Sequence, residues 1–203
     1  MAGWTTDAVK FGATATLALT VLLKGGKGHR QKKMAAAILF AATGDLFLIL
    51  LDAAMPLGVL SFLTAYLLLI RAYGTGRKPG LGEAVAGLPF LLLIAAAAWW
   101  LSPSLGTTFS IGGFAAGLVL SLMAWLAVRL LFGGPFKPAT ARLLVASGML
   151  MFLCDLGVAL GLHPSFTGSS RVLLEQIIWA AYLPGWTLLA LAVLEVESES
   201  EQN

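Results

Sequence analysis

The sequence predicts an all-α protein, a polytopic transmembrane helical bundle of about seven helices. Of its 203 residues, 59% are hydrophobic and 11% are charged, whereas soluble domains carry about 25% charged residues. The apolar residues form unbroken runs instead of the strict alternation that marks the strands of a membrane β-barrel. Seven helices of about 20 residues use roughly 140 residues and leave about 60 for loops and tails. These proportions exclude a soluble enzyme core and a single-pass anchor with a large soluble domain.

The first four apolar runs predict helices over residues 4–23, 34–51, 55–73 and 84–101. The first is interrupted by Asp7 and Lys10, and it ends in a basic loop, so it is expected to stay as a helix and not to be removed as a signal peptide. The second follows that loop. The third begins with Pro56 in its first turn, where proline is well tolerated. The fourth ends in Trp99 and Trp100, a pair typical of a membrane interface.

The remaining runs predict helices over residues 109–132, 141–162 and 172–194. The fifth contains Gly117, and the sixth contains Gly157 and Gly161, small residues that let membrane helices approach closely. In the seventh, Pro184 predicts a kink, because proline cannot donate a backbone hydrogen bond. Residues 1–194 are therefore expected to form one transmembrane domain, and the acidic residues 195–203 a disordered tail.

The basic residues predict the orientation of the bundle. All of them except Lys10 and Arg171 lie in or beside three alternating connections. These residues are Lys24, Lys27, Arg30, Lys32 and Lys33 in the first connection, Arg71, Arg77 and Lys78 in the third, and Arg129, Lys137 and Arg142 in the fifth. Since basic loops stay on the cytoplasmic side, the N-terminus is expected outside and the C-terminus inside.

Ionisable residues of four predicted helices lie at a similar depth. Asp45 is about 9 Å and Asp155 roughly 10 Å from the outer ends of their helices, at about 1.5 Å per residue. Glu175 is placed in the first turn of the last helix, and Lys10 in the outer part of the first. A carboxylate in hydrocarbon is costly, so such residues face a bundle interior or a wet cavity. Their convergence predicts a functional site in the outer half of the membrane.

Purely structural interpretations of the same residues remain open. Asp45 could form a membrane salt bridge with Lys10, and Asp52 could simply end a helix at the interface. Glu175 could stabilise a helix N-terminus. The stripe that Glu175 forms with Trp179, Tyr182 and Trp186 at helical spacing could serve packing instead of binding.

Few residues could bind a metal or a cofactor. The chain has one cysteine, Cys154, in an apolar run, and two histidines, His29 and His163, both expected in loops. This pattern predicts no disulfide framework, no metal site and no cofactor. It contains no sign of nucleic-acid binding, and it leaves the oligomeric state open.

Several short motifs resemble the lysoplasmalogenase family of membrane proteins (YhhN-like). They are Phe40-Ala-Ala-Thr-Gly-Asp-Leu-Phe-Leu48, the helix from Gly58 to Tyr73, Gly148-Met-Leu-Met-Phe-Leu-Cys-Asp155, Ala181-Tyr-Leu-Pro-Gly185 and Lys10-Phe11. The resemblance covers nearly the whole chain. It lacks the first of the family's usual eight helices, which agrees with an outside N-terminus.

The sequence departs from the family pattern at several positions and keeps both acidic ones. Tyr66 stands where the family usually has His, Cys154 where it has Ser, Phe11 where it has Pro, and Gly185 where Gln is common. Asp45 and Asp155 match the family's two aspartates.

The resemblance implies hydrolysis of the vinyl ether bond of lysoplasmalogens, with a lysophospholipid substrate taken from the surrounding membrane lipids. Asp45 and Asp155 would be the catalytic acid and base, with the order open. Buried carboxyl groups in contrasting environments suit this chemistry, as in glycosidases. The substrate-binding residues would be Lys10, Tyr66, Glu175, Trp179 and Tyr182.

Alternative functions are a hydrolase of another ether or ester lysolipid, and a small proton- or cation-coupled transporter. The chain has no internal repeat and no matched pair of broken helices, which are typical of carriers. A retinal protein is excluded because no lysine lies between Val172 and Leu194. The small size and simple loops favour the inner membrane of a bacterium.

Overall fold

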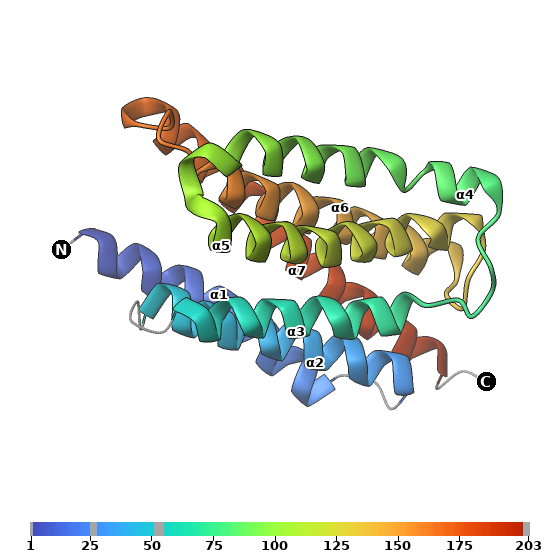
Figure 1. The fold of residues 1–203 in the computed structure, drawn as a ribbon. Coiled ribbons are helices and arrows are strands. Elements are labelled where there is room, and N and C mark those ends of the chain that lie inside the picture. The colour runs from blue at the N-terminus through green and yellow to red at the C-terminus, as the bar shows by residue number, and fades with distance from the viewer. Residues whose placement is uncertain (1, 25–27, 51–54, 201–203) are drawn as a thin grey trace. The chain divides into compact units, whose positions relative to one another are not determined.

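The computed structural model is all-helical in the residues that it describes, which are 2–24, 28–50 and 55–200 (Figure 1). Within these ranges, side chains are described except at 2–7, 49–50, 105–110 and 196–200. Asp52 lies outside the described residues. The chain divides into two compact units, of which the first is formed by Met1–Gly74 with Trp186–Asn203, and the second by Thr75–Gly185.

In the first unit, α2 (His29–Asp45) packs against both α1 (Ala2–Lys24) and α3 (Met55–Tyr73) (Figure 1). A π-helical turn, η1 (Leu46–Leu50), continues α2. At the start of α2, Arg30 Nη1 donates to the carbonyl oxygens of Ala72 and Gly74 at 2.6 and 2.8 Å. The last carbonyls of a helix need outside donors, so Arg30 caps α3 and fixes α2 and α3 antiparallel.

The second unit contains α4 (Leu81–Val85), α5 (Leu88–Arg129), η3 (Leu130–Phe132), α6 (Pro138–Leu160) and α7 (Gly168–Ser200) as far as Gly185. Although α5 is one helix by its backbone hydrogen bonds, its halves run side by side in opposite directions (Figure 1). Gly117 lies against Ile94, and Ser121 Oγ donates to the Phe90 carbonyl at 3.3 Å. The predicted fourth and fifth helices are therefore the two arms of α5.

Five helical stretches are long and apolar enough to cross a membrane: Met55–Tyr73, Leu81–Ser104, Ile111–Phe132, Pro138–Leu160 and Gly168–Glu195. They make the chain a multi-pass membrane protein. The first two of the seven predicted spans, α1 and α2, do not meet the same criterion among the described residues. For α2 the reason is physical, because it has 17 residues and its first turns are basic.

Helix boundaries follow the prediction at α3, which covers Met55–Tyr73 as expected. Differences occur where the prediction relied on hydropathy alone, because polar residues need not end a helix. Thus α6 begins at Pro138 and α7 at Gly168, earlier than predicted. The acidic segment was expected to form a tail, and in the structure α7 continues through it to Ser200. Glutamate is a good helix former, and this segment has no glycine or proline to stop the helix.

Candidate functional site

Asp45 is the last residue of α2 and is buried, at 3% exposure. Its Oδ2 accepts a hydrogen bond from Thr14 Oγ1 of α1 at 2.6 Å, in a buried contact. A short bond of this kind to a carboxyl group is among the stronger hydrogen bonds in proteins. Thr14 therefore fixes the carboxyl group of Asp45 between α1 and α2.

Lys10 lies on the same face of α1 as Thr14, since residues four apart on a helix are neighbours. The Thr14 hydroxyl is also 3.3 Å from the Lys10 carbonyl oxygen, within the same turn. Helix geometry thus brings Lys10 to the side of α1 that carries Thr14 and faces Asp45. This position fits both a substrate contact and a structural partnership with Asp45.

The backbone around Asp45 departs from a regular α-helix. The π-helical turn η1 begins at the residue after Asp45, and such π-turns occur frequently at functional sites. One residue earlier, α2 crosses α3 at very short range. A Cβ on Gly44 would lie 2.6 Å from the Phe62 ring, and a Cβ on Gly58 would lie 2.5 Å from Leu48 Cγ. Both positions of this crossing require glycine.

Aromatic rings surround this crossing within the first unit. Phe62 of α3 contacts Gly44, and its ring centroid lies 6.4 Å from those of both Tyr66 and Trp186. Tyr66 is 3% and Trp186 1% exposed. Trp186 comes from the part of α7 that belongs to this unit. The first unit thus combines a buried carboxyl group with the negative faces of aromatic rings, which attract positive charge.

Asp155 belongs to the second unit, near the end of α6, where α6 and α7 run antiparallel. Ser147 Oγ donates to the Gly185 carbonyl at 2.8 Å, and further along the pair Gly157 packs against Ile178. Asp155 lies between these two contacts and is half-buried. It is therefore level with the α7 segment between Ile178 and Gly185.

That segment of α7 carries two of the predicted binding residues. The rings of Trp179 and Tyr182 pack edge to face, with centroids 5.2 Å apart. Tyr182 is 7% exposed, and Trp179 is half-buried. Asp155, Trp179 and Tyr182 thus lie at one level of the α6–α7 pair, and their role in a site stays a prediction.

Glu175 lies in a different environment. Its carboxylate is 3.2 Å from Arg171 Nε in an i,i+4 ion pair, with side chains 56% and 58% exposed. Because α7 begins at Gly168, Glu175 is beyond the first turn, so the expected stabilisation of a helix N-terminus loses its basis. Exposed pairs of this kind contribute little to stability, and a contact of Glu175 with substrate stays a prediction.

Comparison with known protein families shows to which family the chain belongs. A sequence model of the YhhN family matches residues 5–193. The chain belongs to the YhhN family. This is the family of lysoplasmalogenases, and a membrane-embedded enzyme fits the apolar helices. Neither the curated proteins nor the solved structures compared with the chain gave a match.

The YhhN match includes every predicted site residue, from Lys10 to Tyr182, and ends before the acidic end of the chain. Within the described residues, no three His, Cys, Asp or Glu side chains come together as metal ligands would. The predicted site residues carry carboxyl, ammonium, phenol and indole groups. These groups can transfer a proton and stabilise a cation.

Sequence reasoning missed three residues of the first unit: Thr14, which binds Asp45, Phe62, which lies against the neighbouring Gly44, and Trp186, whose ring lies near Phe62. Thr14 is one of several threonines in α1, and only the packing of α1 on α2 selects it. A signal for Phe62 did exist, because it lies one helical turn before Tyr66. Trp186 belonged to the predicted aromatic stripe of α7 but was not assigned to the site. The structure shows that it contacts Phe62.

Proposed function

We propose that this YhhN-family protein is a lysoplasmalogenase, which hydrolyses the vinyl ether bond of a lysophospholipid within the membrane. The observation that carries the proposal is the buried carboxyl group of Asp45, held by Thr14 beside a π-helical turn and aromatic rings. Family membership supplies the substrate class.

The reaction needs one acid and one base. A carboxylic acid protonates the vinyl carbon remote from the ether oxygen, which gives an oxocarbenium ion. Water adds to the carbon next to oxygen and loses a proton to a carboxylate, and the resulting hemiacetal breaks down to a fatty aldehyde and a glycerophospho-alcohol. In this proposal Asp45 and Asp155 supply the two carboxyl groups, and neither role is yet assigned to one of them.

The remaining predicted residues would bind the substrate. The ammonium group of Lys10 can pair with the lipid phosphate or with a carboxylate. The ring faces of Tyr66 and Phe62 can stabilise positive charge in the oxocarbenium ion, and Trp179 with Tyr182 can contact the acyl chain.

Purified protein with a vinyl ether lysolipid in deuterated water tests the reaction. Protonation at carbon puts one deuterium on the carbon next to the aldehyde group, which can be read by mass spectrometry after reduction of the aldehyde. A saturated ether lysolipid should not be cleaved. Cleavage of an ester lysolipid, without aldehyde release from the vinyl ether, would instead identify a different lysolipid hydrolase.

Substitution of the two aspartates tests their roles. Asp45→Asn and Asp155→Asn should each lower turnover by at least about 100-fold, as loss of general acid–base catalysis does. The double variant should lose little more than either single one, because residues that act as a unit are not additive. Unchanged thermal midpoints would exclude unfolding as the cause. Near-normal aldehyde release by either single variant would contradict the assignment.

A further inference from the structure

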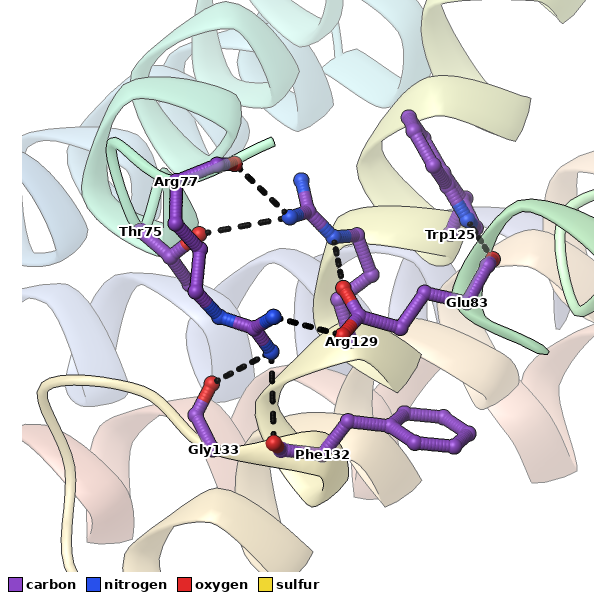
Figure 2. Close-up of polar contacts among 7 residues, drawn as sticks. All are labelled: Thr75, Arg77, Glu83, Trp125, Arg129, Phe132 and Gly133. Carbon is purple, nitrogen blue, oxygen red and sulfur yellow. Dashed lines mark hydrogen bonds and ion pairs between the residues drawn. The ribbon is translucent and has the colours of Figure 1, made fainter. Parts of the chain in front are cut away.

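A buried ionic cluster of the second unit is not used by the proposed reaction. We call Arg77, Glu83 and Arg129 the Glu83 cluster. Figure 2 shows the Glu83 carboxylate between two guanidinium groups, 2.8 Å from Arg129 Nε and 2.7 Å from Arg77 Nη1. The indole Nε1 of Trp125 donates to the Glu83 carbonyl at 2.6 Å and fixes α4 on the second arm of α5.

The cluster lies far from Asp155 along the same unit. Ala127 of α5 packs against Gly148 of α6, and the short connection between α5 and α6 makes these helices antiparallel. Arg129 is therefore level with the stretch of α6 just before Gly148. Asp155 is about nine residues further on, which corresponds to roughly 14 Å along a helix. The Glu83 cluster is a separate site.

The charges of the cluster do not balance. Glu83 is the one carboxylate that the described residues bring within ion-pair distance of Arg77 or Arg129. The other contacts of Arg129 are to groups without a formal charge: the Arg77 carbonyl at 3.1 Å, Thr75 Oγ1 at 3.4 Å and the Trp125 ring, whose centroid lies 5.2 Å from Arg129 Cζ. The cluster thus carries one excess positive charge, and its Arg129 is only 5% exposed. Buried charge without a counter-ion is costly, so the cluster favours an anion.

Unused donors point in the same direction. Each guanidinium group has five N–H donors. Besides Glu83, Arg77 uses Nη2 toward the carbonyl oxygens of Phe132 and Gly133, at 3.2 and 3.4 Å. Among the described residues, Arg77 Nε and Arg129 Nη1 have no such partner. The Arg77 side chain is 42% exposed, so an outside ligand can reach it. Phosphate oxygens match this planar array of donors well.

The surroundings of the cluster favour a lipid. One apolar stretch begins at Leu81, and another ends at Phe132, so the cluster lies at a membrane boundary. Apolar side chains beside it are strongly exposed, including Leu81 at 84%, Leu131 at 55% and Phe132 at 54%. Basic pockets between membrane helices are known to bind lipid phosphates. These exposed residues would contact the acyl chain of the same lipid.

We propose that the Glu83 cluster binds the phosphate of an anionic phospholipid headgroup, with the exposed guanidinium group of Arg77 as its main contact. Glu83 orients both arginines, and the ligand neutralises their excess positive charge. The competing interpretation is a purely structural clamp that ties the connection after α3 to the end of α5.

Thermal unfolding of the full chain in detergent separates these interpretations. A short-chain phosphatidylglycerol should raise the midpoint by about 5 °C at about 100 times its dissociation constant. Phosphatidylcholine of equal chain length should not. Inorganic phosphate is the third ligand to be tested. If inorganic phosphate gave the full shift and phosphatidylglycerol gave none, the ligand of the site would be free phosphate and the proposed lipid would be wrong.

Matched variants locate the effect. Arg77→Gln leaves the pair of Glu83 with Arg129, so the basal midpoint should change little while the lipid-induced shift is lost. Arg142→Gln removes another exposed arginine of this unit and should keep the full shift. Arg77→Lys keeps the positive charge but lacks the planar guanidinium donors, so it should lose more than half of the lipid-induced shift in the midpoint. This variant tests the proposal even if Arg77→Gln folds poorly. An unchanged shift in both Arg77 variants, or none in the wild type, would overturn the proposal in favour of the structural clamp.

Discussion

Replacement of Gly58 by alanine is the sharpest test of the α2–α3 crossing beside Asp45. The added Cβ would lie 2.5 Å from Leu48 Cγ and 3.2 Å from the Gly44 carbonyl oxygen, whereas carbon atoms pack at about 3.5–4.0 Å. The leucine side chain can turn away, but the backbone carbonyl cannot move without shifting α2. Gly58→Ala should therefore separate the two helices.

The expected magnitude follows from two opposing effects. Overpacking of this kind costs about 1–3 kcal/mol, and alanine in a helix regains about 0.5–1 kcal/mol relative to glycine. Gly12→Ala is the matched control, because nothing lies within 4 Å of its added Cβ and it carries the same helix-forming gain. The difference between the two variants isolates the overlap, at about 1–3 kcal/mol.

Thermal unfolding in detergent measures this difference, and aldehyde release measures its effect on activity. At about 2–4 °C for each kcal/mol, Gly58→Ala should unfold roughly 2–12 °C below Gly12→Ala. Its turnover should fall as well, because Asp45 is adjacent to the crossing. In a Leu48→Ala background the cost of Gly58→Ala should shrink. Equal midpoints for the two glycine variants would refute the close crossing.

Three further substitutions test individual contacts. Thr14→Val removes the donor to Asp45, so it should lower the free energy of unfolding by about 1–3 kcal/mol and reduce turnover. Thr14→Ser keeps the hydroxyl group and should behave like the wild type in both measurements. Equal turnover of the Val and Ser variants would contradict a positioning role for Thr14. Ser147→Ala removes the buried bond to the Gly185 carbonyl and should cost about 1 kcal/mol in the free energy of unfolding. Gly157→Ala meets only a flexible isoleucine side chain at 2.9 Å, so its midpoint should fall less than that of Gly58→Ala.

Much of the fold could be predicted because the membrane constrains a sequence strongly. A spanning segment must satisfy its own backbone hydrogen bonds, so long apolar runs identified the main helices of the described residues, and α3 matched to the residue. The runs did not predict the short α4, and they divided α5 into two helices. Hydropathy failed where a helix leaves the apolar region. It could not show that α7 continues to Ser200, or that α2 passes into a π-helical turn after Asp45.

The candidate site was predictable to a smaller extent. Asp45 and Asp155 were selected because charged residues are rare in the apolar runs. A carboxyl group in a membrane helix is energetically costly, so its presence indicates a functional or structural role. From the sequence, Arg129 was predicted to be one of the basic residues of the fifth connection. In the structure it is buried in an ion pair with Glu83, and no local pattern joins two residues so far apart in the chain.

The sequence by itself determined the helical membrane class, the order of the helices and the acidic residues worth testing. These follow from hydrophobicity and charge, which are local properties of each segment. Only the tertiary structure decided that Thr14 holds Asp45, that Gly44 and Gly58 meet at a close crossing, and that Arg77 and Arg129 share one carboxylate. These contacts depend on which faces of distant helices meet, and that outcome is set by packing of the whole unit rather than by any one segment.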